Sequence, residues 1–108
     1  MTASASVRES IVRLAALIQQ SLDELYRSSA PFASNSSLNQ AGLVNGAQIV
    51  GDYVSHNELG LAFEHLIYML VEPGIEVTKV QLEEIATVGG HLGLPAGTWQ
   101  RVRVHSTV

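Results

Sequence analysis

The sequence predicts an all-α protein, a single-domain bundle of four to five helices over residues 1–108. Three observations support this prediction. Apolar residues recur at every third or fourth position over long stretches, which is the period of an amphipathic helix. Helix-start signals and breaking residues divide the chain into segments with short connections. A length of 108 residues, 46% of them apolar and none of them cysteine, suits one core without disulfides.

The first predicted helix covers residues 7–26. Its apolar residues follow one another at helical spacing and are Val7, Ile11, Leu14, Ile18, Leu22 and Leu25. Ser6 followed by Glu9 predicts a capping box at its start, and residues 1–6 are expected to form a flexible tail. The serine-rich segment 28–37 has no period and predicts a loop.

A second helix is predicted over about 38–53. The residues expected on its inner face are Leu43, Ala47, Val50 and Val54. Three glycines each weaken its helix propensity by about 1 kcal/mol, so this helix must depend on packing. They are Gly42, Gly46 and Gly51, and we interpret the spacing of Gly42 and Gly46 as a place where another helix approaches closely.

The third helix combines a predicted cap with an apolar stripe. Ser55 is the expected N-cap and Glu58 its capping-box partner, with Val54 and Leu59 as a hydrophobic staple. The stripe that follows consists of Leu59, Phe63, Leu66 and Leu70, with Ala62 and Ile67 at its margins. Glu72-Pro73-Gly74 ends this helix, because proline cannot continue it and glycine permits the reversal.

The fourth helix is predicted to begin at about Lys79. Thr78 and Gln81 form a second capping box, and the expected inward residues are Leu82, Ile85 and Val88. Two alternatives remain for the end of the chain. Either Pro95 opens a short helix that carries Trp99, or residues 101–105 alternate like a strand, although no partner strand is evident.

Composition argues against several functional classes. Six basic residues against ten acidic ones give a net charge of −4, so a binder of nucleic acid or anionic membranes is not expected. No apolar stretch approaches the roughly 20 residues that span a bilayer. Arg8, Glu9 and Arg13 interrupt any secretory signal. We therefore expect a cytoplasmic protein.

The sequence shows no catalytic or metal-binding pattern. None of the four histidines has a second ligand at the spacing of helical metal sites; they are His56, His65, His91 and His105. The glycine-rich stretches lack the Lys-Ser/Thr pair of a phosphate-binding loop, and no serine lies in a nucleophile-type turn. We expect neither an enzyme nor a metal or cofactor.

The negative charge is concentrated in one part of the chain. Residues 52–84 hold seven acidic residues and one lysine, a net charge of −6, whereas residues 1–51 are neutral. On the third helix the acidic residues share the outer face with leucine, histidine and tyrosine, a mixture that suits an interface. The predicted partner-binding residues are Asp52, Glu58, Glu64, His65, Tyr68, Glu72, Glu76 and Glu83. The alternative is an ordinary solvated acidic face.

The segment YVSHNELGLAFEHLIYML, residues 53–70, resembles a pattern of small bacterial toxin-immunity proteins of the MafI kind. The pattern is a hydrophobic residue, one variable residue, His/Asn-Asn-Glu-x-Gly-x-Ala, three variable residues and then leucine. Residues 75–85, Leu92-Gly93-Leu94 and Trp99 also look like the rest of that family's chain, so the resemblance covers about residues 36–100. Similar proteins accompany contact-dependent growth-inhibition toxins.

The resemblance implies an all-helical protein that binds and neutralises a cognate toxin domain, commonly a nuclease. The implied partner is the C-terminal nuclease domain of the toxin, and such a domain tends to be basic because it handles phosphates. An acidic inhibitor would mask its active or substrate-binding surface by electrostatic attraction. The alternative is a helical regulatory or adaptor module that docks a partner's helix between its own helices.

Overall fold

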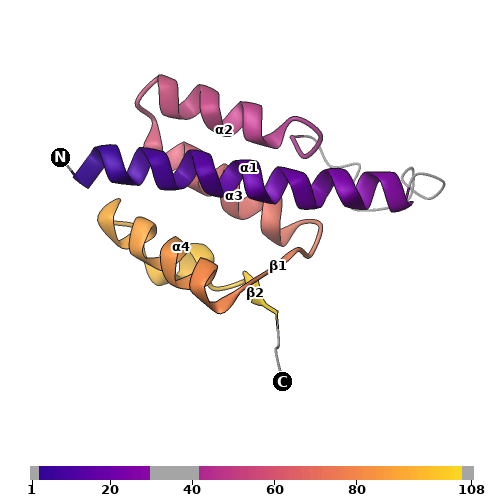
Figure 1. Cartoon of the computed structure of the whole chain (residues 1–108). Coiled ribbons are helices and arrows are strands. Elements are labelled where there is room, and N and C mark those ends of the chain that lie inside the picture. Colours follow the sequence, from indigo (N-terminus) through magenta and orange to yellow (C-terminus); the bar gives the residue numbers. More distant parts are fainter. Residues whose placement is uncertain (1–2, 30–41, 106–108) are drawn as a thin grey trace.

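The computed structural model describes residues 3–29 and 42–105. These residues form four α-helices, one 3-10 helix and two short strands: α1 (Ala3–Ser29), α2 (Gly46–Ser55), α3 (Leu59–Val71), β1 (Glu76–Val77), α4 (Lys79–His91), η3 (Ala96–Trp99) and β2 (Arg103–Val104). The predicted all-α class is confirmed. α2 and α4 flank α1 on opposite sides, and α3 lies behind it (Figure 1).

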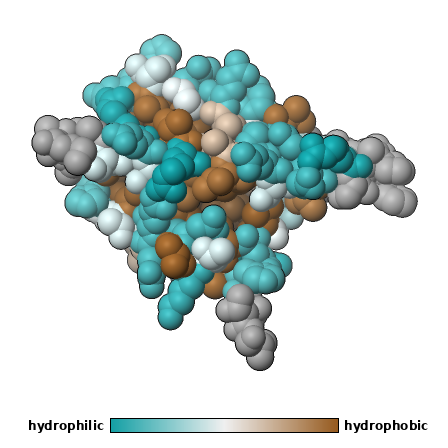
Figure 2. Space-filling model, in the orientation of Figure 1, coloured by the Kyte–Doolittle hydropathy of each residue, from teal (hydrophilic) through white to brown (hydrophobic). Residues whose placement is uncertain are grey.

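From the same side, small hydrophobic patches are scattered among hydrophilic residues (Figure 2).

α1 is longer than predicted at both ends. It begins at Ala3, so residues 3–6 are helical and the predicted tail is wrong for them. Nothing in Ala3-Ser4-Ala5 breaks a helix, because alanine has the highest helix propensity. Ser6 therefore lies inside α1, and the capping box with Glu9 is wrong, since an N-cap has non-helical backbone.

The predicted loop 28–37 is wrong at its start, because α1 continues to Ser29. The rest of the predicted loop, 30–37, lies outside the described residues. The inward face of α1 agrees with the prediction, with Leu25 half-buried and the other five residues buried.

α2 starts later than predicted. Residues 42–45 form a turn in which Gly42 has a φ of +87°, and residues 38–41 lie outside the described part of the chain. The expected close approach is confirmed at Gly46, where a Cβ would lie 2.6 Å from the Cε of Met69. A Cβ on Gly51, by contrast, would meet nothing within 4 Å.

The turn between α2 and α3 corrects the predicted start of the third helix. Ser55 is the last residue of α2, and its hydroxyl donates to a backbone carbonyl of its own helix. Glu58 stands at the N-cap of α3 without a side-chain capping bond. Asn57 has a φ of +60°, a conformation that asparagine tolerates better than most residues. Arg8 of α1 fixes this turn by donating to the Val54 carbonyl (2.8 Å) and to the Asn57 side chain.

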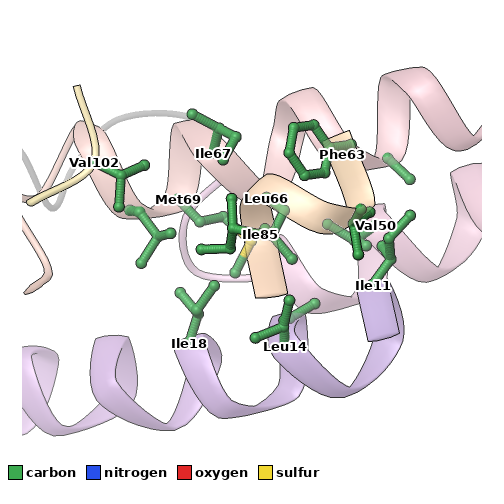
Figure 3. Packing of buried hydrophobic residues seen from close by; sticks show 14 of the residues in the cluster. Ile11, Leu14, Ile18, Val50, Phe63, Leu66, Ile67, Met69, Ile85 and Val102 are labelled. Atoms are coloured by element: carbon green, nitrogen blue, oxygen red, sulfur yellow. The ribbon is translucent and has the colours of Figure 1, made fainter. Parts of the chain in front are cut away.

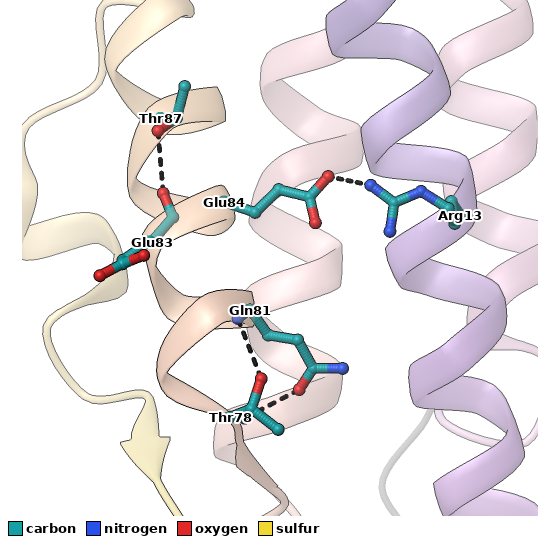
Figure 4. A network of polar contacts seen from close by, with 6 residues as sticks. All are labelled: Arg13, Thr78, Gln81, Glu83, Glu84 and Thr87. Carbon is teal, nitrogen blue, oxygen red and sulfur yellow. Dashed lines mark hydrogen bonds and ion pairs between the residues drawn. The ribbon is translucent and has the colours of Figure 1, made fainter.

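α4 begins as predicted. The Gln81 amide donates to Thr78 Oγ1 (3.0 Å), and the Thr78 amide donates to Gln81 Oε1 (2.8 Å), which confirms the capping box (Figure 4). The break before α4 is also confirmed, because α3 ends at Val71 and Gly74 has a φ of +75°.

Both alternatives for the C-terminal residues occur in the structure. η3 follows Pro95, and β2 pairs in parallel with β1, with Glu76 opposite Arg103 and Val77 opposite Val104. The His105 amide then donates to the Val77 carbonyl at 2.7 Å. The partner strand is not evident in the sequence because two residues are too short to show an alternating pattern.

A single core joins the four α-helices. Phe63, Leu66 and Leu70 are buried as predicted, and Leu59 is half-buried. Figure 3 shows α3 residues meeting Ile11, Leu14 and Ile18 of α1, Val50 of α2 and Ile85 of α4. The Trp99 ring of η3 meets Phe63 edge to face at 6.0 Å between centroids. Because its neighbours cover α3 on most sides, only one outer strip of this helix remains partly or fully exposed.

Candidate partner-binding surface

The predicted partner-binding residues come from several elements. Six belong to the hairpin formed by α2 and α3: Asp52 in α2, Glu58 before α3, Glu64, His65 and Tyr68 in α3, and Glu72 just after it. The other two are Glu76 in β1 and Glu83 in α4. The structure therefore concentrates the predicted set on one hairpin and places two members on other elements.

Four residues form a continuous strip along the outer face of α3. They are spaced by three or four positions, so each lies next to the following one on the helix surface; they are Leu61, Glu64, Tyr68 and Glu72. Leu61 is 46% exposed, Glu64 is exposed, and Tyr68 and Glu72 are half-buried. This α3 strip combines two carboxylates with a phenol ring and an aliphatic side chain. The sequence analysis did not predict Leu61 as a site residue, although its helical position, three residues before Glu64, places it on the same outer face.

His65 lies beside the α3 strip and is engaged within the protein. Its Nε2 is 3.0 Å from the Gly42 carbonyl oxygen, and its ring centroid is 5.3 Å from that of Tyr68. A Cβ on Gly42 would come within 2.8 Å of the His65 Cε1. His65 therefore fixes the turn before α2 and supports Tyr68. The sequence gives no sign of this role, because it depends on a contact between distant segments.

Tyr68 also has a tyrosine neighbour on α1. Burial raises the pKa of Tyr26, and the nearby Asp23 and Tyr68 raise it further. His65 and Tyr68 thus form a ring contact on α3, and Tyr26 of α1 lies nearby. Because fixed neighbours support its ring, Tyr68 has less conformational freedom to lose when a partner binds.

The carboxylates of the acidic segment differ in whether an arginine or histidine side chain lies beside them. Glu84 pairs with Arg13 of α1 (Figure 4), and Glu76 lies 3.1 Å from His105 Nδ1. Within residues 3–29 and 42–105, five others form no ion pair: Asp52, Glu58, Glu64, Glu72 and Glu83. Among the residues that the structure describes, no basic side chain therefore compensates most of the negative charge of the hairpin.

A groove of about 520 Å³ lies between the C-terminal half of α1 and β1. Its lining consists of Ser21, Glu24, Leu25, Gly74, Ile75, Glu76 and His105. Glu76 therefore belongs to this groove and not to the α3 strip. The sequence did not indicate the α1 residues or His105 as neighbours of Glu76, because only the packing of α1 and the pairing of β2 bring them together.

The described ranges contain no group of three or more histidine, aspartate or glutamate residues that could hold a metal ion. Nor does any helix in the described part of the chain have the length and apolar character needed to cross a membrane. No family model, curated protein or solved structure matches the chain.

Proposed function

We propose that this protein is an immunity protein that binds and neutralises the nuclease domain of a cognate bacterial toxin. The observation that supports this most is the α3 strip with its flanking carboxylates, Asp52 and Glu58. This surface is acidic and partly apolar, and its four carboxylates form no ion pair with any of the described residues. A nuclease binds phosphates with basic residues, so an acidic surface of this kind competes for the same place.

The two kinds of side chain in the α3 strip have different roles in this proposal. The carboxylates of Glu64 and Glu72 attract a basic surface over a distance and accelerate association, to as much as ~10⁸–10⁹ M⁻¹s⁻¹ with strong steering. Leu61 and Tyr68 supply contact area that slows dissociation, since aromatic anchors carry much of the energy of an interface. Inhibition then follows from masking and needs no chemistry by this chain.

A helical adaptor that docks a partner's helix is the alternative function. Its support is apolar surface outside the α3 strip: Val12 and Leu17 of α1 are 46% and 39% exposed, and Val80 of α4 is 72% exposed. Hydrophobic docking on these residues is insensitive to salt, whereas the binding of an acidic surface to a basic one weakens as salt rises.

The gene directly upstream provides the test. The proposal expects it to encode a large secreted protein with a variable C-terminal domain. Expressed alone in bacteria, that domain should stop growth, and co-expression of this chain should restore it. The double variant Glu64→Lys/Tyr68→Ala should lose the rescue while its circular dichroism stays helical.

Glu9→Lys is the matched control, because it reverses a charge on an exposed residue of α1. This variant should rescue growth like the wild type. Full rescue by the double variant would show that the toxin binds elsewhere on the chain. Toxicity that the wild-type chain does not relieve would contradict the proposed function itself.

A further inference from the structure

The groove between α1 and β1 has the chemistry of a site for a basic side chain. Leu25 and Ile75 are half-buried and give it an apolar floor, while Glu24 and Glu76 place carboxylates at its sides. Its described lining contains no lysine or arginine. The volume of about 520 Å³ lies in the range of typical ligand sites and has room for a short peptide segment.

The contacts that Glu24 and Glu76 make within the protein are weak. Glu24 pairs with Arg27 one turn further along α1, and both side chains are about 70% exposed. Glu76 pairs with His105, whose side chain is 62% exposed. Because water screens such exposed pairs, they contribute little to stability. A cation from a partner can therefore replace Arg27 and His105 beside these carboxylates without a large loss of folding stability.

The groove continues into a narrow crevice between α1 and α4. Ser21, Ile75 and Glu76 line both the groove and the crevice. Most of the residues that line the crevice are apolar, among them Leu17, which is 39% exposed, but the crevice has a volume of only about 30 Å³. A long basic side chain therefore fits the groove and not the crevice, because in the groove its aliphatic stem packs on Leu25 and Ile75 while its charged end reaches the carboxylates.

We infer that this groove receives a segment of the partner protein that presents an arginine or lysine beside an apolar residue. The aliphatic stem packs on Leu25 and Ile75, and the charged end lies between Glu24 and Glu76. The apolar neighbour contacts Leu17. The inference rests on the proposed function for the identity of the partner, and it adds a second contact that shares no lining residue with the α3 strip.

The test uses two capped peptides and the full chain. Acetyl-Leu-Arg-Ala-amide carries the cation, and acetyl-Leu-citrulline-Ala-amide has nearly the same shape without the charge. In ¹⁵N NMR titrations, the arginine peptide should shift the amide signals of Leu25, Ile75, Glu76 and His105. The citrulline peptide should bind roughly three- to tenfold more weakly, as expected for the loss of exposed charge interactions.

Two glutamate variants complete the experiment. Glu76→Gln should weaken binding of the arginine peptide severalfold, and Glu24→Gln provides an independent second variant. Glu9→Gln on α1, an exposed residue outside the groove lining, should leave it unchanged. Equal binding of both peptides, or shifts confined to other amides, would overturn the inference. Since the titration needs no toxin, its failure leaves the growth-rescue result for the α3 strip unaffected, and the reverse also holds.

Discussion

At the scale of single residues, two adjacent glycines of α4 have opposite surroundings. A Cβ on Gly89 would lie 2.2 Å from the Trp99 ring, whereas a Cβ on Gly90 would meet nothing within 4 Å. Gly89 thus permits η3 to pack against α4 and brings Trp99 to Phe63. Gly90 is exposed and has no such role.

We expect alanine at these two positions to change stability in opposite directions. Gly89→Ala gains about 1 kcal/mol of helix propensity but forces Trp99 to move, at a cost of roughly 1–3 kcal/mol. The net effect should be destabilising, while Gly90→Ala should stabilise by up to about 1 kcal/mol. Urea unfolding followed by Trp99 fluorescence measures both. Stabilisation by both substitutions would contradict the packing of Trp99 against α4.

The raised pKa of Tyr26 predicts a dependence of stability on alkaline pH. The folded protein holds the phenol proton more tightly than the unfolded chain does. Below the usual tyrosine pKa of 10.0 the phenol is neutral in both states, so this stabilisation is fully present. As the pH rises through the folded pKa, the unfolded state loses its proton first and the free energy of unfolding falls.

Tyr26→Phe should therefore lose less stability than the wild type when the pH is raised from about 9 to about 11.5, around the ordinary tyrosine pKa. Urea midpoints of both proteins at these two pH values measure the difference. Parallel losses in the two proteins would show that Tyr26 does not contribute to the alkaline transition.

At the scale of elements, two similar sequence patterns have different structural outcomes. Thr78 and Gln81 form a complete capping box, while Ser55 and Glu58 form none. The difference lies in the preceding residues, since a cap needs non-helical backbone. Thr78 follows β1, whereas Ser55 is still part of α2. A local motif does not show this, because Arg8 of α1 helps to place the turn after Ser55.

Alanine substitutions distinguish the two motifs. Thr78→Ala removes the side chain that accepts from the Gln81 amide and should cost about 1 kcal/mol. Ser55→Ala removes only an exposed hydroxyl and should change stability by less than about 0.5 kcal/mol. The free energy of unfolding in urea tests both. Equal losses would indicate that Ser55 caps α3 after all.

Most of the helical fold follows from the sequence, because each buried stripe is a local periodic pattern. The buried faces of α1 and α3 and the cap of α4 were all predictable in this way. The β1–β2 pair and the contact of His65 with Gly42 were not, since each joins segments that lie far apart in the chain. The α3 strip was largely predictable because it lies within one helix. The groove around Glu76 was not, because its lining comes from α1, residues 74–76 and His105.

At the scale of the whole molecule, the overall charge of −4 divides into surfaces of different kinds. The pairing of Arg13 with Glu84 compensates part of the acidic segment, and His105 lies beside Glu76. The remaining carboxylates are concentrated on the α2–α3 hairpin, where they surround Leu61 and Tyr68. In our account this remaining charge attracts a basic toxin domain, and the apolar side chains hold it.

The most direct measurement is the association rate of this chain with the purified toxin domain at about 0.05 M and 0.5 M salt, which differ severalfold in screening length. The wild-type rate should fall at least about tenfold at the higher salt. Glu64→Lys should associate more slowly at low salt and approach the wild-type rate at high salt, while Glu9→Lys should match the wild type. Rates that change with neither salt nor Glu64→Lys would contradict the acidic docking surface.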